Sequence, residues 1–267
     1  MATILSRKTF GKLPVIRRLK KSILLRSFRG KEIGVFRGRF STYEDAQRSL
    51  PPSALSGYDD EQLVAGNLES FSLIHAFDWP VIALCQRLIR EAKLHTMTDF
   101  GGHVGVKYYA FEKMLGLKSG FAWQVVDVPA MIREGRARIA PGNVVLKFFE
   151  TLEETGPAEG LLLSGVLQYA HLSIEEIFAK LPKKPYIVFL NKVPVSDRCG
   201  YFTIEKYVKP LPYRIYGAGE LDTIRERLGY QRVAQWPIPY RNIITLSSSG
   251  MDLVNMIGEA WCLDELS

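Results

Sequence analysis

The sequence has few cysteines and no long apolar run. Its 267 residues include three cysteines, Cys85, Cys199 and Cys262, which are far apart and form no CxxC pair. This usage argues against a disulfide framework or a zinc knuckle and favours reduced thiols. The longest apolar stretches, LLLSGVL and YIVFL, are far shorter than the roughly 20 residues that span a bilayer. The N-terminus also lacks a signal peptide's hydrophobic region and cleavage site, so we expect a cytoplasmic protein.

Acidic residues are nearly absent from the first 40 positions. This segment holds twelve Lys or Arg and one acid, Glu32, out of 35 basic and 28 acidic residues in the chain. The remainder therefore has 35 − 12 = 23 bases and 28 − 1 = 27 acids. The basic character belongs to one segment, which favours a local anionic partner. Because the rest of the chain is mildly acidic, we do not expect a nucleic-acid partner.

The basic segment contains a predicted amphipathic helix at 13–28, LPVIRRLKKSILLRSF, with apolar residues three and four positions apart. Such a helix either lies on an anionic membrane, with residues 7–31 in peripheral contact at the inner face, or packs on the protein with its charges solvated. We assign residues 1–60 to a basic N-terminal extension. Residues 61–267 form the main domain, which begins with leading helices at 61–93.

The rest of the chain alternates apolar strand-like runs with helical runs. Strands are predicted at 95–100, 122–128, 144–149, 161–165, 186–191, 231–238 and 242–248. Helices are predicted at 43–50, 79–93, 106–115, 129–138, 173–181 and 219–228. Ser41 or Thr42 is the expected cap of the first helix, and Asp78 that of the second. The pattern indicates an α/β fold with a mostly parallel seven-stranded sheet, whose last two strands form an antiparallel hairpin at one edge.

A glycine-rich turn, TDFGGHVG, follows the first of these strands. Ligands of open α/β sheets bind beyond the carboxyl ends of the strands. A dinucleotide-binding G-x-G-x-x-G would need glycine where Phe100 stands, and Asp99 would lie unfavourably beside a pyrophosphate. S-adenosylmethionine carries a sulfonium and an ammonium and no phosphate, so an acid followed by glycines suits it better. Asp127, at the end of the next strand, can accept hydrogen bonds from two ribose hydroxyls of either cofactor.

The sequence resembles the class I S-adenosylmethionine-dependent methyltransferases. It is most similar to a bacterial family associated with surface-polysaccharide biosynthesis. The matching segments run from about residue 34 to 236 and are GVFRGRFSTYEDA, GYDD, TDFGGHVGVKYY, WQVVDVP, LLLSGVLQY, YIVFLNKVPV, YRIY and LGYQRVAQW. One position departs from the family's glycine-rich loop, because this chain has His103 where a glycine is usual.

The resemblance implies a Rossmann-like fold, S-adenosylmethionine as cofactor and a set of site residues. The cofactor-binding residues that it implies are Asp99, Gly101, Gly102, Gly105, Asp127, Val128, Phe149, Glu150, Ser164, Gly165 and Gln168. Asp99 and the glycines belong to the methionine-side loop, and Asp127 to the ribose. Phe149 and Glu150 lie near the adenine, and the segment from Ser164 to Tyr169 lines the methyl-transfer face.

The segment SGVLQY at 164–169 lacks the D/N-P-P-aromatic motif of methyltransferases that modify base amino groups. It resembles the corresponding segment of hydroxyl methyltransferases, with Gln168 in place of a histidine, so we expect an oxygen acceptor. A hydroxyl acceptor benefits from a general base, and His103 and His171 are the candidates by position. Either could instead be an ordinary loop residue, while His75 and His95 are assigned structural roles. No cluster has metal-ligand spacing, so we predict no metal.

Two regions near the expected site keep open roles. Asn191-Lys192, at the end of the fifth strand, either contacts the acceptor or caps a turn. The segment 196–207 forms either a lid or a long connection. We expect an O-methyltransferase acting on a sugar hydroxyl of a surface glycan or of its lipid-linked precursor. The alternative is an inactive methyltransferase-fold protein that serves as a binding or scaffold protein.

Overall fold

The computed structural model describes residues 34–50, 73–206, 210–239, 243–248 and 250–263. The predicted basic helix at 13–28, the membrane-contacting segment 7–31 and residues 61–72 of the leading helices lie outside these ranges. Within them, no helix is long and apolar enough to cross a membrane. The described strands form one sheet of eleven, in the order β4-β3-β2-β5-β6-β11-β10-β1-β7-β8, with β9 also paired to β11.

The parallel half of the sheet comprises β4-β3-β2-β5-β6, in which every neighbouring pair is parallel. Its strands are β2 (Thr96–Phe100), β3 (Ala122–Val126), β4 (Leu146–Phe149), β5 (Gly160–Ser164) and β6 (Ile187–Val195). The helices between and after them are α6 (Val106–Leu115), α7 (Pro129–Arg138), α8 (Ile174–Lys180) and α9 (Glu220–Arg227). These elements confirm the predicted alternation of strands and helices.

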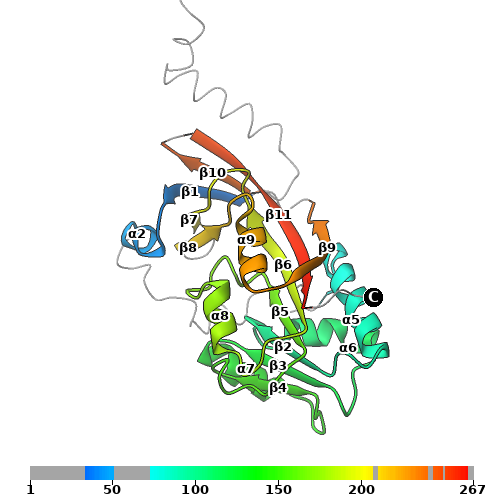
Figure 1. Ribbon diagram of the computed structural model, residues 1–267. Coiled ribbons are helices and arrows are strands. Elements are labelled where there is room, and N and C mark those ends of the chain that lie inside the picture. The colour runs from blue at the N-terminus through cyan, green and yellow to red at the C-terminus, as the bar shows by residue number, and fades with distance from the viewer. Residues whose placement is uncertain (1–33, 51–72, 207–209, 240–242, 249, 264–267) are drawn as a thin grey trace, which may run out of the picture.

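The distal half of the sheet comprises β10-β1-β7-β8 and was not predicted as a unit. Its strands are β1 (Gly34–Phe40), β7 (Tyr201–Lys206), β8 (Pro210–Ile215) and β10 (Ile243–Ser247). The long β11 (Gly250–Cys262) runs from this half to the parallel half (Figure 1). Its first residues pair with β10 and its last residues lie between β6 and β9 (Gln231–Pro237).

Two parts of the fold prediction are wrong. The sheet has eleven strands instead of seven, because β1, β7, β8 and the long β11 (Gly250–Cys262) add to the seven predicted strands, of which 242–248 is β10. The predicted hairpin between 231–238 and 242–248 does not form, because β9 and β10 each pair antiparallel with β11. The segment 196–207 contains β7, and Gly34–Phe40 of the assigned extension is itself a strand of the sheet.

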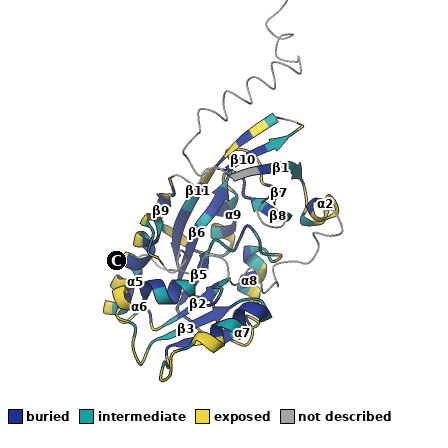
Figure 2. Cartoon of the chain, turned by 180° about the vertical axis from the view of Figure 1, so that it is seen from behind, coloured by how far each residue is buried: buried dark blue, intermediate teal, exposed yellow. Residues whose placement is uncertain are grey.

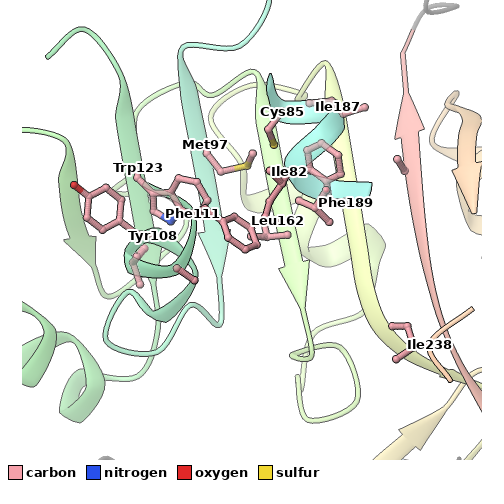
Figure 3. Packing of buried hydrophobic residues seen from close by; sticks show 14 of the residues in the cluster. Ile82, Cys85, Met97, Tyr108, Phe111, Trp123, Leu162, Ile187, Phe189 and Ile238 are labelled. Carbon is pink, nitrogen blue, oxygen red and sulfur yellow. The ribbon is translucent and has the colours of Figure 1, made fainter. Parts of the chain in front are cut away.

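Helices cover both faces of the parallel half. Because successive side chains of a strand point to opposite faces, Leu162 faces α5 (Trp79–Arg90) and α6, whereas Leu161 and Leu163 face α8 and α9. Figure 3 shows Ile82 and Cys85 of α5 and Tyr108 and Phe111 of α6 in the hydrophobic core on the Leu162 face of the sheet. The strands between the two layers are buried and the outer helix surfaces exposed (Figure 2). The strands of the parallel half are therefore packed on both faces.

Two helix starts show how the local sequence is used. Thr42 caps α2 (Tyr43–Arg48) as predicted, because its side chain accepts a hydrogen bond from the Asp45 backbone N–H. Asp78 occupies the capping position of α5 but makes no side-chain capping bond there. Its carboxylate is directed instead toward the site described below.

Candidate functional site

A pocket lies where the parallel strands end. The chain leaves β2 toward β3 and β4 on one side and returns as β5 and β6 on the other, so the strand order reverses at β2. Ligands of open α/β sheets bind at such switch points. The pocket encloses about 400 Å³, counted with its open mouth, and is lined by His75, Phe77, Asp99, Gly101, Gly102, Val106, Lys107, Ser164 and Lys192. Four of these residues were predicted to bind a cofactor: Asp99, Gly101, Gly102 and Ser164.

Asp99 is the acid of this pocket. Its residue is 1% exposed, and the Trp123 Nε1–H donates a hydrogen bond to its Oδ2 at 3.1 Å. Burial raises the pKa of Asp99 to about 7, although Trp123 and the charge of Lys107 act in the opposite direction. A nearby cation favours the ionised form of a buried acid. A cationic ligand bound in the pocket would therefore favour the ionised form of Asp99.

The glycines after Asp99 are required by the packing of the chain itself. Gly101 has φ +72°, and a Cβ there would lie 2.3 Å from Cγ2 of Val166. A Cβ at Gly102 would lie 2.7 Å from Cγ of Asp99. Gly105, with φ +89°, is the N-cap of α6 in a left-handed conformation that suits glycine. The lack of side chains at Gly101 and Gly102 thus lets the turn pack against Val166 and Asp99.

Asp127 closes the turn from the neighbouring strand end. Its Oδ2 accepts from the His103 backbone N–H and its Oδ1 from the Val128 backbone N–H, both at 2.7 Å. Burial raises its pKa, and these two hydrogen bonds partly offset the rise. A carboxylate has about four lone-pair positions, so each oxygen can accept a further hydrogen bond. Asp127 is half-buried and lies beside the pocket, outside its lining.

His103 occupies the position where the resembled family has glycine, and it keeps a glycine-like backbone with φ +56°. Burial lowers the pKa of His103 to about 4, assisted by the charge of Arg138, so its ring is neutral near pH 7. His171 is exposed, and its Nε2 lies 3.3 Å from the Tyr43 hydroxyl. Neither candidate base lines the pocket. The histidine that does so is His75, which we had assigned a structural role; its ring stacks on Phe77 at 5.0 Å.

The other implied site residues lie around this centre. Val128 is half-buried beside Val104 and Met131, and Phe149 ends β4. Glu150 is exposed, and its backbone N–H donates to Glu154. Gly165 has φ +77° and is followed by a turn that includes Gln168, whose Oε1 is buried without a hydrogen-bond partner among the described atoms. Ser164 Oγ, in the pocket wall, is likewise buried without one.

A buried ion pair supports one wall of the pocket. Lys107 Nζ donates to both carboxylate oxygens of Asp78, at 2.8 and 2.9 Å, and the Asp78 side chain is fully buried. Asp78 also accepts from Asn191 Nδ2 at 3.2 Å and from the His75 backbone N–H at 3.0 Å. One carboxylate thus joins α6, β6 and the segment that carries His75 and Phe77. No local sequence pattern predicts this cluster, because its members are brought together only by the fold.

Among the described residues, no group of three or more His, Cys, Asp or Glu is placed to hold a metal ion. No protein-family model and no curated protein sequence matches the chain.

Solved structures with a similar fold include several methyltransferases. One is 1,6-didemethyltoxoflavin-N1-methyltransferase of Burkholderia thailandensis with bound 1,6-didemethyltoxoflavin and S-adenosylhomocysteine, with 14% identity, TM-score 0.41 and coverage of 97% of this chain and 92% of that one. Human N-acetylserotonin methyltransferase in complex with SAM has 12% identity, TM-score 0.45 and coverage of 81% and 62%. The O-methyltransferase NcsB1, in complex with S-adenosylhomocysteine and 1,4-dihydroxy-2-naphthoic acid, has 15% identity, TM-score 0.43 and coverage of 81% and 61%. This chain spans about three fifths of the last two proteins. Similarity at this level does not by itself assign a function.

Proposed function

We propose that this protein is an S-adenosylmethionine-dependent methyltransferase that acts on an oxygen acceptor. The observation that carries the proposal is Asp99, an acid that is 1% exposed and lines a pocket at the switch point of the sheet. Desolvation makes such an acid costly to ionise, and an ammonium group offsets that cost. The S-adenosylmethionine-bound neighbours of similar fold are consistent with this choice of cofactor.

The residues present fit this cofactor. Asp99 would hold the ammonium of the methionine moiety, and Asp127 would accept the ribose hydroxyls with the lone pairs that the two backbone N–H groups leave. Ser164 Oγ, buried and without a hydrogen-bond partner in the described protein, offers a further polar contact in the pocket wall. When bound, the cofactor would supply a methyl group to the acceptor oxygen. The bond between the methyl carbon and sulfur breaks as the new carbon–oxygen bond forms, and the electron pair of the broken bond stays on sulfur.

The acceptor hydroxyl must lose its proton as the methyl group arrives. His103 and His171 remain the proposed bases, and His75 joins them because it lines the pocket and a base must come within hydrogen-bond reach. The chain's main contribution to such a transfer is positioning. The proposed acceptor is a sugar hydroxyl of a surface glycan or its lipid-linked precursor, a choice that rests on the sequence resemblance.

Calorimetric titration with S-adenosylhomocysteine (SAH) tests the proposal. We expect saturable binding by the wild-type protein and a dissociation constant raised roughly 10- to 150-fold in Asp99→Asn, since a charge-assisted interaction is removed. Lys147→Met, an exposed change on β4, serves as the control and should bind as the wild type does. Absence of SAH binding by the wild type would overturn the methyltransferase proposal in favour of a scaffold function.

A lipid-linked acceptor would place the protein at an anionic membrane, so we extend the proposal to peripheral contact through residues 7–31. Each Lys or Arg near such a surface contributes about 1 kcal/mol. Deleting residues 1–30 should abolish co-sedimentation with anionic vesicles at low salt while SAH binding persists. Vesicle binding that survives the deletion, or that is missing from the intact chain, would remove this extension and leave the catalytic proposal unaffected.

A further inference from the structure

Lys192 has an unusual backbone at the carboxyl end of the parallel strands. Its φ is +61°, a left-handed conformation that is strained for a non-glycine residue. The pairing of β6 with β11 shifts here, since Leu190 pairs with Glu259 and Val193 with Ile257. Two residues of β6, Asn191 and Lys192, therefore face a single residue of β11. Bulges of this kind redirect a side chain and recur beside functional sites.

The bulge directs Lys192 into the pocket. A Cβ on Gly165 would lie 2.8 Å from both Cε and Nζ of Lys192, so the side chain extends across the turn that follows β5. The lysine lines the pocket with Asp99 and Ser164, and its Nζ is 5.9 Å from the centre of the Phe77 ring. Its charge also acts on the Asp99 carboxyl group from across the pocket. The missing side chain at Gly165 and the strained backbone of Lys192 thus both contribute to placing the Lys192 ammonium in the pocket.

The strand order assigns this cation to the acceptor side. The main proposed cofactor contacts lie at the ends of two neighbouring strands: Asp99 is near the carboxyl end of β2 and Asp127 follows β3. Lys192 belongs to β6, two strands away from β2 in the opposite direction, or about 10 Å at the usual strand spacing. A cofactor held by β2 and β3, with Ser164 at the end of β5 as its contact nearest to β6, leaves the space over β6 for the acceptor.

We propose that Lys192 binds an anionic group of the acceptor, a carboxylate or a phosphate, beside the position of methyl transfer. The proposal rests on the methyltransferase function proposed above and narrows its acceptor to anionic compounds. A lysine ammonium is a compact charge with three hydrogen-bond donors, which suits either group. The cofactor's own carboxylate offers the same chemistry, and the experiments below separate the two sources.

The first experiment titrates the protein with inorganic phosphate and with benzoate at constant ionic strength, following the melting temperature with and without saturating SAH. The wild type should respond saturably to at least one anion, and Lys192→Met should raise the midpoint roughly 10- to 150-fold. Lys192→Arg keeps the charge and should retain a response, and Lys147→Met should match the wild type. A wild type without a saturable response, or a response unchanged in Lys192→Met, would overturn the proposal.

The second experiment measures SAH affinity in wild type and Lys192→Met, together with the affinity for an SAH analogue that lacks only the carboxylate. Since the Lys192 charge also favours ionised Asp99, both affinities can shift together in the variant, and an anionic acceptor group predicts that their ratio stays as in the wild type. A loss that affects SAH and spares the decarboxylated analogue would assign Lys192 to the cofactor carboxylate and overturn the acceptor proposal. If the wild type binds no SAH, the methyltransferase function fails, and the anion titration without SAH still decides whether Lys192 binds anions.

Discussion

Two aspartates, Asp127 beside the parallel half of the sheet and Asp252 where β11 pairs with the distal half, each accept two hydrogen bonds, and the donors differ. Asp127, after β3, accepts from the backbone N–H groups of His103 and Val128. Asp252, in β11, accepts from the hydroxyls of Ser196 and Tyr201 at 2.8 and 3.0 Å. The backbone donors leave the Asp127 carboxylate at a strand end beside a pocket, whereas the side-chain donors connect Asp252 to the segment after β6 and to β7. The first arrangement can serve a ligand, and the second joins segments of the chain.

The same two halves differ in how far the sequence predicts them. Strands of the parallel half are buried on both faces and read as continuous apolar runs, such as YIVFL and LLLSG. The distal strands GVFRGRF, YFTIEK and PLPYRI mix charges, glycine and proline, which are typical of turns. Their positions depend on β11, whose partners lie far away in the sequence. A pairing between distant strands has no local signature, so the hairpin prediction was wrong.

The residues of the candidate site also differ in how far the sequence predicts them. Asp99, the glycine turn and Asp127 stand at predicted strand ends, so their proximity follows from the parallel order of the strands. Lys107 and Asp78 meet through the packing of α6 on the start of α5, and Lys192 is redirected by a bulge. Neither feature has a periodicity or a motif in the sequence. Contacts that depend on tertiary packing were therefore missed.

The largest expected effect in the parallel half is that of Gly101→Val. The new side chain would meet Val166 and would also have to adopt φ +72°, so strain and overpacking together should cost about 3 kcal/mol or more. Gly142→Val is the matched control, because Gly142 has φ +83° and nothing within 4 Å of the added Cβ. Its cost should be limited to about 1–2 kcal/mol for the backbone alone. Denaturant unfolding measures both, and equal costs would show that Val166 does not constrain the turn.

Asp127→Asn should weaken SAH binding roughly 10- to 150-fold, because one oxygen and the charge that would receive the ribose hydroxyls are lost. Calorimetry measures this effect. The unfolding free energy should fall as well, since the His103 and Val128 N–H groups share the same carboxylate. Unchanged SAH affinity would move the ribose contact away from β3.

Asp252→Asn tests the distal half with the same chemical change. It weakens the hydrogen bonds from Ser196 and Tyr201 in a residue that is 8% exposed, so we expect a loss of about 1–3 kcal/mol in unfolding free energy. SAH affinity should stay as in the wild type. A variant that loses SAH binding while remaining folded would show that the distal half is coupled to the site.

The pH dependence of SAH binding should reflect Asp99. Its pKa of about 7 lies well above the usual value for Asp, so the folded protein retains a proton that the unfolded chain releases near pH 4. The unfolding free energy contributed by this group therefore falls as pH rises from about 4 to 7. Binding of an ammonium requires the ionised acid, so SAH affinity should rise up to about tenfold per pH unit below 7 and level off above it. Asp99→Asn should bind weakly with no such slope; an equal slope in this variant would assign the titration to another group.

The smallest expected effect is that of His103→Gly, which restores the glycine of the resembled family. Releasing a left-handed non-glycine backbone gains about 1–2 kcal/mol. The greater freedom of glycine in the unfolded chain costs about 0.5–1 kcal/mol, so the net gain in stability should be about 1.5 kcal/mol or less. The His103 N–H that binds Asp127 belongs to the backbone, and glycine keeps it. SAH affinity should therefore persist, in contrast to Asp127→Asn. If His103→Gly instead abolishes SAH binding while the melting temperature holds, the imidazole itself contacts the cofactor. The parallel half would then bind its ligand through a side chain at the position where this chain departs from the family pattern.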